Sequence, residues 1–77
     1  MADERLSINI LFPVLNERLR LESGIDRAMA YLREHVTIPY ELTILDNGSE
    51  DETPQIGQRL EKTYPEVTYV RVGQRGV

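Results

Sequence analysis

The chain has 77 residues, a formal charge of −4 at pH 7 and no cysteine. Its length limits it to one small domain or part of one, because so short a chain buries a modest fraction of its surface on folding. The acidic balance disfavours a nucleic-acid partner, and without cysteine there is neither a disulfide nor a thiolate metal site. We expect neither a signal peptide nor a membrane span, since no run approaches the roughly 20 apolar residues that cross a bilayer.

The first predicted strand covers residues 7–12, which are β-rich and are followed by Pro13. Because proline cannot donate a hydrogen bond to a neighbouring strand, we expect the strand to end there. Residues 1–6 precede it and are expected to be disordered.

The first predicted helix runs from about residue 17 to residue 35, with Asn16 as its cap. Apolar residues recur there at spacings of three and four, which is typical of one face of an amphipathic helix. These residues are Leu21, Ile25, Ala28, Met29 and Leu32.

The second predicted strand covers residues 40–45 and ends in a short apolar run, as a buried parallel strand does. Asp46 follows it directly. Asn47 and Gly48 come next and are typical of a tight turn.

A second helix and a third strand complete the predicted elements. Thr53 as N-cap and Pro54 in the first turn open a helix over residues 55–63. Pro65 ends this helix, because proline cannot continue it. Residues 67–72 then alternate between apolar and polar side chains, which predicts the third strand.

The order β-α-β-α-β predicts an α/β fold with a three-stranded parallel sheet, the N-terminal half of a Rossmann-like domain. With right-handed crossovers, we expect the first strand in the middle of the sheet and at least one unpaired sheet edge. Residues 73–77 have the composition of a loop leading into another helix, so we interpret the chain as a single truncated domain.

A strand that ends at a carboxylate and passes into a helix is how open α/β sheets build ligand crevices. We therefore expect a binding site at Asp46. The alternative is a plain turn and capping loop, because Asn-Gly favours tight turns and Ser49 can cap a helix. The loop of residues 13–17, which ends the neighbouring strand, favours the binding site. Glu17 can both belong to that site and stabilise the helix start.

Two loop sequences resemble those of family 2 glycosyltransferases of the GT-A fold. They are Pro13-Val14-Leu15-Asn16-Glu17 after the first strand and Asp46-Asn47-Gly48-Ser49-Glu50-Asp51-Glu52-Thr53-Pro54 after the second. The likeness is to the dolichyl-phosphate and polyprenyl-phosphate sugar synthases in particular, and it extends over residues 7–77. Asn47 stands where those proteins have a second aspartate.

The resemblance implies a GT-A nucleotide-sugar-binding domain whose donor is a UDP- or GDP-sugar and whose acceptor is a lipid phosphate or a saccharide. It implies one nucleotide-binding set, Pro13, Leu15, Glu17, Asp46, Asn47 and Ser49. The first three residues would line the base and ribose, and Asp46 with Asn47 would contact the base edge. Carboxylates suit this role because they accept hydrogen bonds from base N–H groups and ribose hydroxyls. The resemblance also places Gly76 near the donor phosphates.

The family's D-x-D metal motif and its catalytic aspartate follow the third strand and would lie beyond Val77. The resemblance therefore implies a hexosyltransferase that uses Mg²⁺ or Mn²⁺ as a full-length protein, with no catalytic or metal-binding residue in this chain, which is expected to be inactive alone. Asp51 and Glu52 precede a helix, where its dipole favours carboxylates, and are not interpreted as metal ligands. The expected location is the cytoplasm, or the cytoplasmic face of a membrane through parts outside this chain.

Two other classes of function compete with this interpretation. One is a non-catalytic α/β module of flavodoxin-like or response-regulator-like topology that binds a small ligand or a protein. The other is an interaction piece that pairs through its open sheet edge, for instance as a homodimer.

Overall fold

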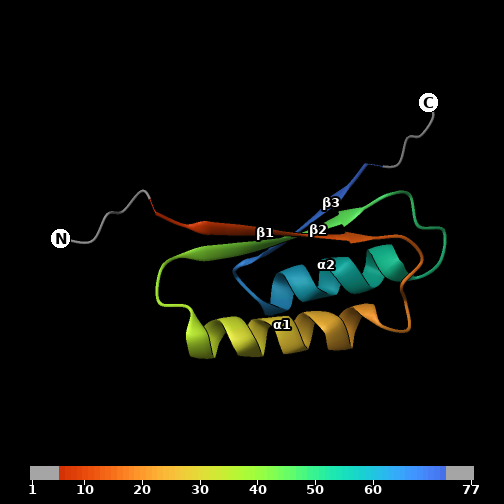
Figure 1. Cartoon of the computed structure of the whole chain (residues 1–77). Coiled ribbons are helices and arrows are strands. Elements are labelled where there is room, and N and C mark those ends of the chain that lie inside the picture. Colours follow the sequence, from red (N-terminus) through yellow and green to blue (C-terminus); the bar gives the residue numbers. More distant parts are fainter. Residues whose placement is uncertain (1–5, 73–77) are drawn as a thin grey trace.

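The computed structural model describes residues 6–72, which form a parallel three-stranded sheet and two helices (Figure 1). The elements follow in the order β1 (Ile8–Val14), α1 (Leu21–His35), β2 (Tyr40–Asp46), α2 (Thr53–Thr63) and β3 (Val67–Arg71). The α/β class, the alternating order and the parallel sheet predicted from the sequence are confirmed.

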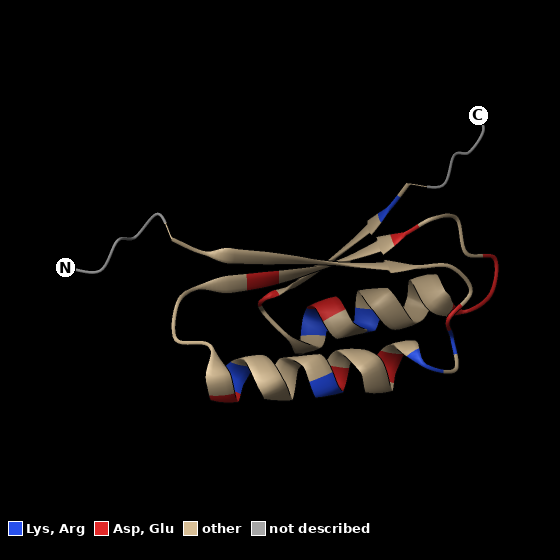
Figure 2. Ribbon diagram, in the orientation of Figure 1, with Lys and Arg blue, Asp and Glu red and all other residues tan. Residues whose placement is uncertain are grey.

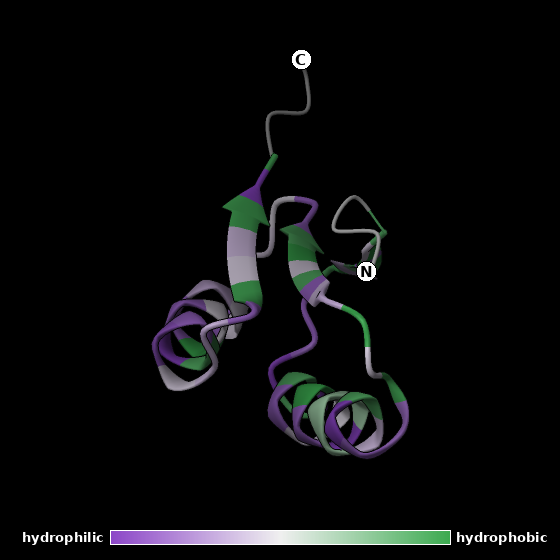
Figure 3. Ribbon diagram, turned by 90° about the vertical axis from the view of Figure 1, so that its left-hand side faces the viewer, coloured by the Kyte–Doolittle hydropathy of each residue, from purple (hydrophilic) through white to green (hydrophobic). Residues whose placement is uncertain are grey.

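The order of the strands in the sheet is β1-β2-β3, so the prediction of the first strand in the middle is wrong. β2 takes the central place, and its Leu42, Ile44 and Asp46 have no exposed surface. Because parallel crossovers are right-handed, two successive crossovers in the same direction bring both helices to the same face of the sheet. Figures 1 and 3 show α1 and α2 together on one side of it.

The core lies between this face of the sheet and the two helices. Figure 3 shows the helices turning hydrophobic residues toward the strands. The buried apolar side chains are Val14, Leu21, Ile25, Met29, Leu32, Leu42, Ile44, Leu60 and Val67. Most of the stripe predicted for the first helix is buried among them, which confirms its amphipathic face. Within residues 6–72, neither helix is long and apolar enough to span a bilayer.

β1 continues through Pro13 to Val14, whereas the sequence predicted its end before the proline. The Ile8 N–H group donates to Pro39, and the Val14 carbonyl accepts from Asn47, so both point toward β2 and its flanking residues. Successive residues of a strand point their backbone polar groups to opposite sides. Pro13 therefore turns its missing N–H group to the outer edge, where no hydrogen bond is lost.

α1 begins at Leu21, four residues later than predicted. The preceding residues form a turn in which the N–H groups of Arg20 and Leu21 both donate to the Glu17 carbonyl. Arg20 occupies the N-cap position, so the prediction that Asn16 caps this helix is wrong.

α2 begins at Thr53, with Glu52 in the N-cap position, and ends at Thr63 before Pro65. The predicted cap, Thr53, instead lies inside the first turn and uses its hydroxyl elsewhere. Pro54 in the first turn is confirmed.

The opposite face of the sheet carries no helix within the described residues, and Leu11 there is 61% exposed. In the same part of the chain, the outer edges of β1 and β3 have no partner strand, as the sequence predicted.

Ile44→Val is expected to lower the free energy of unfolding by about 1 kcal/mol, because it removes a methylene group from the fully buried centre of β2. The matched control is Ile8→Val, which makes the same change where the side chain is 36% exposed and should cost less than about 0.5 kcal/mol. Urea denaturation measures both. Equal losses of stability in the two variants would contradict the prediction that the buried Ile44 contributes more than the partly exposed Ile8.

Candidate functional site

The loops that follow β1 and β2 lie side by side at the carboxyl edge of the sheet. Val14 and Asp46, the last residues of these strands, are paired in the sheet. The two predicted motifs therefore meet in space, at the right-hand end of the sheet in Figure 1.

Side-chain hydrogen bonds tie the two loops together. The Asn16 N–H group donates to Ser49 Oγ at 2.7 Å, and Asn16 Oδ1 accepts from the Glu50 N–H group at 2.9 Å. The Glu17 N–H group donates to Thr53 Oγ1 at 2.8 Å. Asn16 has a φ of 53°, a conformation that asparagine tolerates better than most residues. The two loops thus form one unit rather than two independent turns.

The carboxylate of Asp46 is fully buried at the base of this unit. Its Oδ1 accepts from the N–H groups of Gly48 at 3.0 Å and Ser49 at 2.8 Å, which closes the loop in an Asx-type turn. Its Oδ2 accepts from the Tyr69 hydroxyl at 2.5 Å, with Arg71 Nη1 at 3.6 Å. Both oxygens are therefore engaged inside the chain.

Burial alone would raise the pKa of Asp46, but the hydrogen bonds from Tyr69, Ser49 and Gly48 outweigh it and leave the pKa below the ordinary value. A carboxyl group with a lowered pKa stabilises the fold above its unfolded pKa, and that stability is lost as the pH falls through the folded pKa. The pKa of Tyr69 is raised, first by burial of the phenol and then by its hydrogen bond to Asp46. Arg71 lowers this pKa and so offsets part of the rise. The phenol therefore stays neutral and able to donate at physiological pH.

The other predicted nucleotide-binding residues differ in exposure. Asn47 and Pro13 are exposed, and Leu15 is 52% exposed. Ser49 is buried and serves the link to Asn16. Gly76, predicted near the phosphates, lies outside the described residues.

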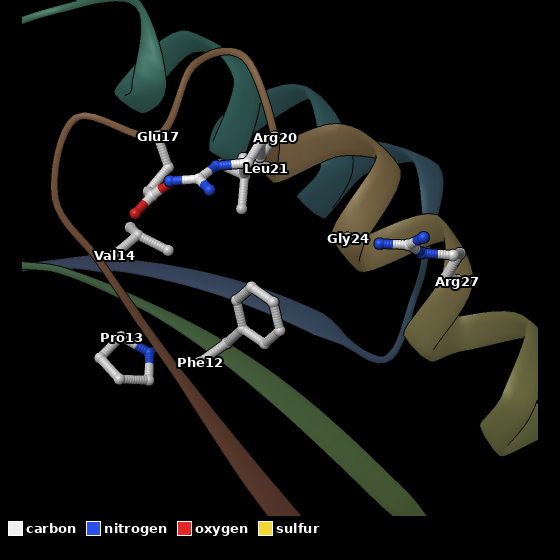
Figure 4. Close-up of a pocket in the computed structure, with 8 residues that line it drawn as sticks. All are labelled: Phe12, Pro13, Val14, Glu17, Arg20, Leu21, Gly24 and Arg27. Carbon is white, nitrogen blue, oxygen red and sulfur yellow. The ribbon is translucent and has the colours of Figure 1, made fainter.

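A cavity of about 350 Å³ lies between the end of β1 and the start of α1 (Figure 4). That volume is at the small end of the range for ligand pockets. Phe12, Val14 and Leu21 form apolar walls, and Glu17 and Arg20 lie together at the rim, 3.2 Å apart. The full lining is Phe12, Pro13, Val14, Glu17, Arg20, Leu21, Gly24 and Arg27.

This cavity brings together two predicted site residues, Pro13 and Glu17, but neither Asp46 nor Asn47 lines it. This cavity therefore does not gather the whole predicted set. Direct contacts to a base or a ribose stay predictions.

The acidic run that follows Ser49 colours the loop between β2 and α2 red in Figure 2. Asp51 Oδ1 accepts from the Thr53 N–H group at 2.8 Å, at the start of α2. Although slight burial raises it, the pKa of Asp51 is lowered overall by the hydrogen bonds from Thr53 and Arg18. This geometry agrees with the prediction that Asp51 supports the helix start.

The residues of the described part of the chain do not fit a metal site. Residues 6–72 hold no group of three or more histidine and carboxylate side chains placed to bind a cation. The Asp46 oxygens at the carboxyl edge are already occupied by Gly48, Ser49 and Tyr69.

Sequence reasoning missed three residues of this site. The sequence assigns Tyr69 no role in the site, although its hydroxyl donates to Asp46. Asn16 and Thr53 are predicted as helix caps, whereas in the structure they join the loops. A signal for Tyr69 existed in the alternation of β3, which places its side chain on the same face as Val67 and the helices. Asn16 and Thr53 had no comparable signal, because their partners are distant in the sequence.

The profile of the family described as Glycosyl transferase family 2 matches residues 9–77. The chain therefore belongs to glycosyl transferase family 2.

Two individual proteins extend this likeness. A dolichyl-phosphate beta-glucosyltransferase of Dictyostelium discoideum is 32% identical over 57 residues, which cover 69% of this chain and 17% of that protein. The structure of the mannosyltransferase PcManGT from Pyrobaculum calidifontis in complex with GDP-Man and Mn²⁺ has a TM-score of 0.68 and 26% identity. This match covers 97% of the present chain and 23% of PcManGT, so the chain spans about a fifth of the length of these two relatives.

Ser49→Ala should lower the free energy of unfolding by about 1 to 2 kcal/mol, because it removes the buried acceptor of the Asn16 N–H group. Ser23→Ala is the control, since Ser23 makes a 3.4 Å contact to a carbonyl at an exposed position and should change stability by less than about 0.5 kcal/mol. Chemical denaturation tests both variants. An unchanged free energy of unfolding in Ser49→Ala would show that this hydrogen bond does not couple the two loops.

Proposed function

We propose that this chain is the N-terminal, nucleotide-sugar-binding part of a family 2 glycosyltransferase, and that it holds the nucleoside portion of a UDP- or GDP-linked sugar. The observation that carries the proposal is the joining of the two motif loops at the carboxyl edge of β1 and β2. Crevices at this edge are where open α/β sheets bind nucleotides.

Asn47 is the proposed contact to the base edge. It is exposed and follows Asp46, whose carboxylate organises the turn beneath it. An amide offers both a donor and an acceptor, so it suits the mixed edge of uracil or guanine. Leu15 and Pro13 supply exposed apolar surface, and the Glu17 carboxylate can accept from ribose hydroxyls.

For the whole protein we propose hexosyl transfer to a polyprenyl phosphate or another membrane-associated acceptor, at the cytoplasmic face of a membrane. The similarity to a dolichyl-phosphate beta-glucosyltransferase supports this acceptor class. A divalent cation, Mg²⁺ or Mn²⁺, would offset the charge of the donor diphosphate, and the Mn²⁺ in the PcManGT complex supports its use. Its ligands would come from outside residues 6–72, so the present chain would bind a nucleotide without catalysing transfer.

Calorimetric titration with UDP and GDP tests the nucleotide site. We expect one of them to bind without Mn²⁺, and Asn47→Ala to weaken that binding about 2- to 10-fold through loss of neutral hydrogen bonds. Asn9→Ala, at an exposed position near the other end of β1, is the matched control and should leave the affinity unchanged.

Absence of binding by a folded chain would contradict a nucleotide site formed by these two loops. Equal effects of Asn47→Ala and Asn9→Ala would contradict the assignment of Asn47.

A homodimer formed through an open sheet edge is a further prediction. The outer edge of β3 suits strand addition better than that of β1, where Pro13 supplies no donor. Size-exclusion chromatography over a range of protein concentrations is expected to show a concentration-dependent dimer. Elution as a monomer at every concentration would contradict it.

A further inference from the structure

We propose that Tyr69 and Gly57 are positioning residues of the nucleotide site, because together they hold the Asp46 carboxylate that shapes the loop presenting Asn47. This inference rests on the proposed function for its ligand, whereas its structural part can be tested without one.

Gly57 makes room for the ring of Tyr69. Gly57 is buried on the face of α2 that meets β3, and Tyr69 lies on β3 opposite it. A Cβ atom at Gly57 would meet Tyr69 Cδ1 first and would lie 2.8 Å from Cε1, closer than real Cβ atoms approach their neighbours. Any larger residue would displace the ring, so the close contact of α2 and β3 depends on this glycine.

The position of the ring brings its hydroxyl to Asp46. The Tyr69 hydroxyl donates to Oδ2, while Oδ1 remains for the N–H groups of Gly48 and Ser49. Gly48 has a φ of 99°, a conformation that L side chains rarely adopt. The turn is thus held at one end by a carboxylate whose orientation Tyr69 fixes.

The effect extends to the loop after β1. Ser49, whose N–H group donates to Asp46, uses its hydroxyl to accept from Asn16. A carboxylate free to rotate would release Ser49 from its place and loosen the contact between the two motif loops. Tyr69 therefore acts on the ligand-facing residues through Asp46 and not by touching the ligand.

A second tyrosine–carboxylate pair provides an internal comparison. The Tyr64 hydroxyl donates to Asp26 Oδ1 at 2.6 Å, an exposed contact between the end of α2 and α1. It joins two helices and supports no loop of the site. Tyr64→Phe therefore removes a bond of the same chemical kind without touching the proposed mechanism.

The inference also predicts a pH dependence. The charged and titratable groups that face Asp46 are Tyr69 and Arg71, both from β3, while its own loop contributes uncharged Gly48 and Ser49 donors. The Tyr69 bond favours the ionised carboxylate, so its loss raises the pKa of Asp46. Loop order should then be lost at a higher pH on acidification than in the unmodified protein.

The test compares Tyr69→Phe with Tyr64→Phe by NMR and calorimetry. In Tyr69→Phe, which keeps the ring, we expect faster hydrogen exchange of the Gly48 and Ser49 amides and a titration midpoint of the Asp46 carboxyl at higher pH. Affinity for the nucleoside diphosphate that binds should fall, by no more than the about 2- to 10-fold expected for Asn47→Ala, because Tyr69 acts only through the loop that presents Asn47. Tyr64→Phe should match the unmodified protein in all three measurements.

Gly57→Ala gives a second, independent test and should reproduce the exchange and titration changes by displacing the ring. Unchanged exchange and midpoint in Tyr69→Phe would overturn the inference, and so would loosened loops with full nucleotide affinity. If the unmodified chain binds neither UDP nor GDP, the proposed function fails. The amide and carboxyl measurements then still decide whether Tyr69 positions Asp46.

Discussion

Asp46 is a carboxylate with no exposed surface at the end of the central strand, and the rest of the site depends on how it is accommodated. Burying an unpaired carboxylate costs several kcal/mol, so both of its oxygens need hydrogen-bond donors. The donors are the N–H groups of its own loop at Oδ1 and the Tyr69 hydroxyl at Oδ2. The turn after β2 and the contact of α2 with β3 at Gly57 both serve this requirement.

This arrangement separates the residue that organises the loop from the residue that the loop exposes. Asp46 uses its oxygens within the chain, whereas Asn47, the next residue, is exposed. A side chain that binds a ligand is held most precisely when the residues that support it have fixed conformations themselves. The bonds from Asn16 to Ser49 and from Glu17 to Thr53 extend this fixed unit to the loop after β1. The loop after β2 thus combines a buried, structural carboxylate with an adjoining position that is exposed.

The central place of β2 in the sheet explains why the loops after β1 and β2 both lead into helices on the same face. With β2 between β1 and β3, α1 and α2 lie side by side on one face, and their first turns lie close to the carboxyl edge. The cavity beside β1 lies between the end of that strand and the start of α1, with Glu17 and Arg20 at its rim. Leu11, on the uncovered face, points away from all of these contacts.

The sequence by itself determined which segments are strands and which are helices, and that the two motif loops follow β1 and β2, because each depends on patterns within a few residues. The apolar run of β2, the stripe of α1 and the carboxylate at Asp46 belong to this class. The tertiary structure alone decided the strand order, the passage of β1 through Pro13 and the partners of Asp46. These depend on contacts between distant residues, such as Tyr69 with Asp46, 23 positions apart, and Asn16 with Ser49, 33 apart. Local periodicity carries no information on such pairs, because it records which face of an element is apolar and not what that face meets.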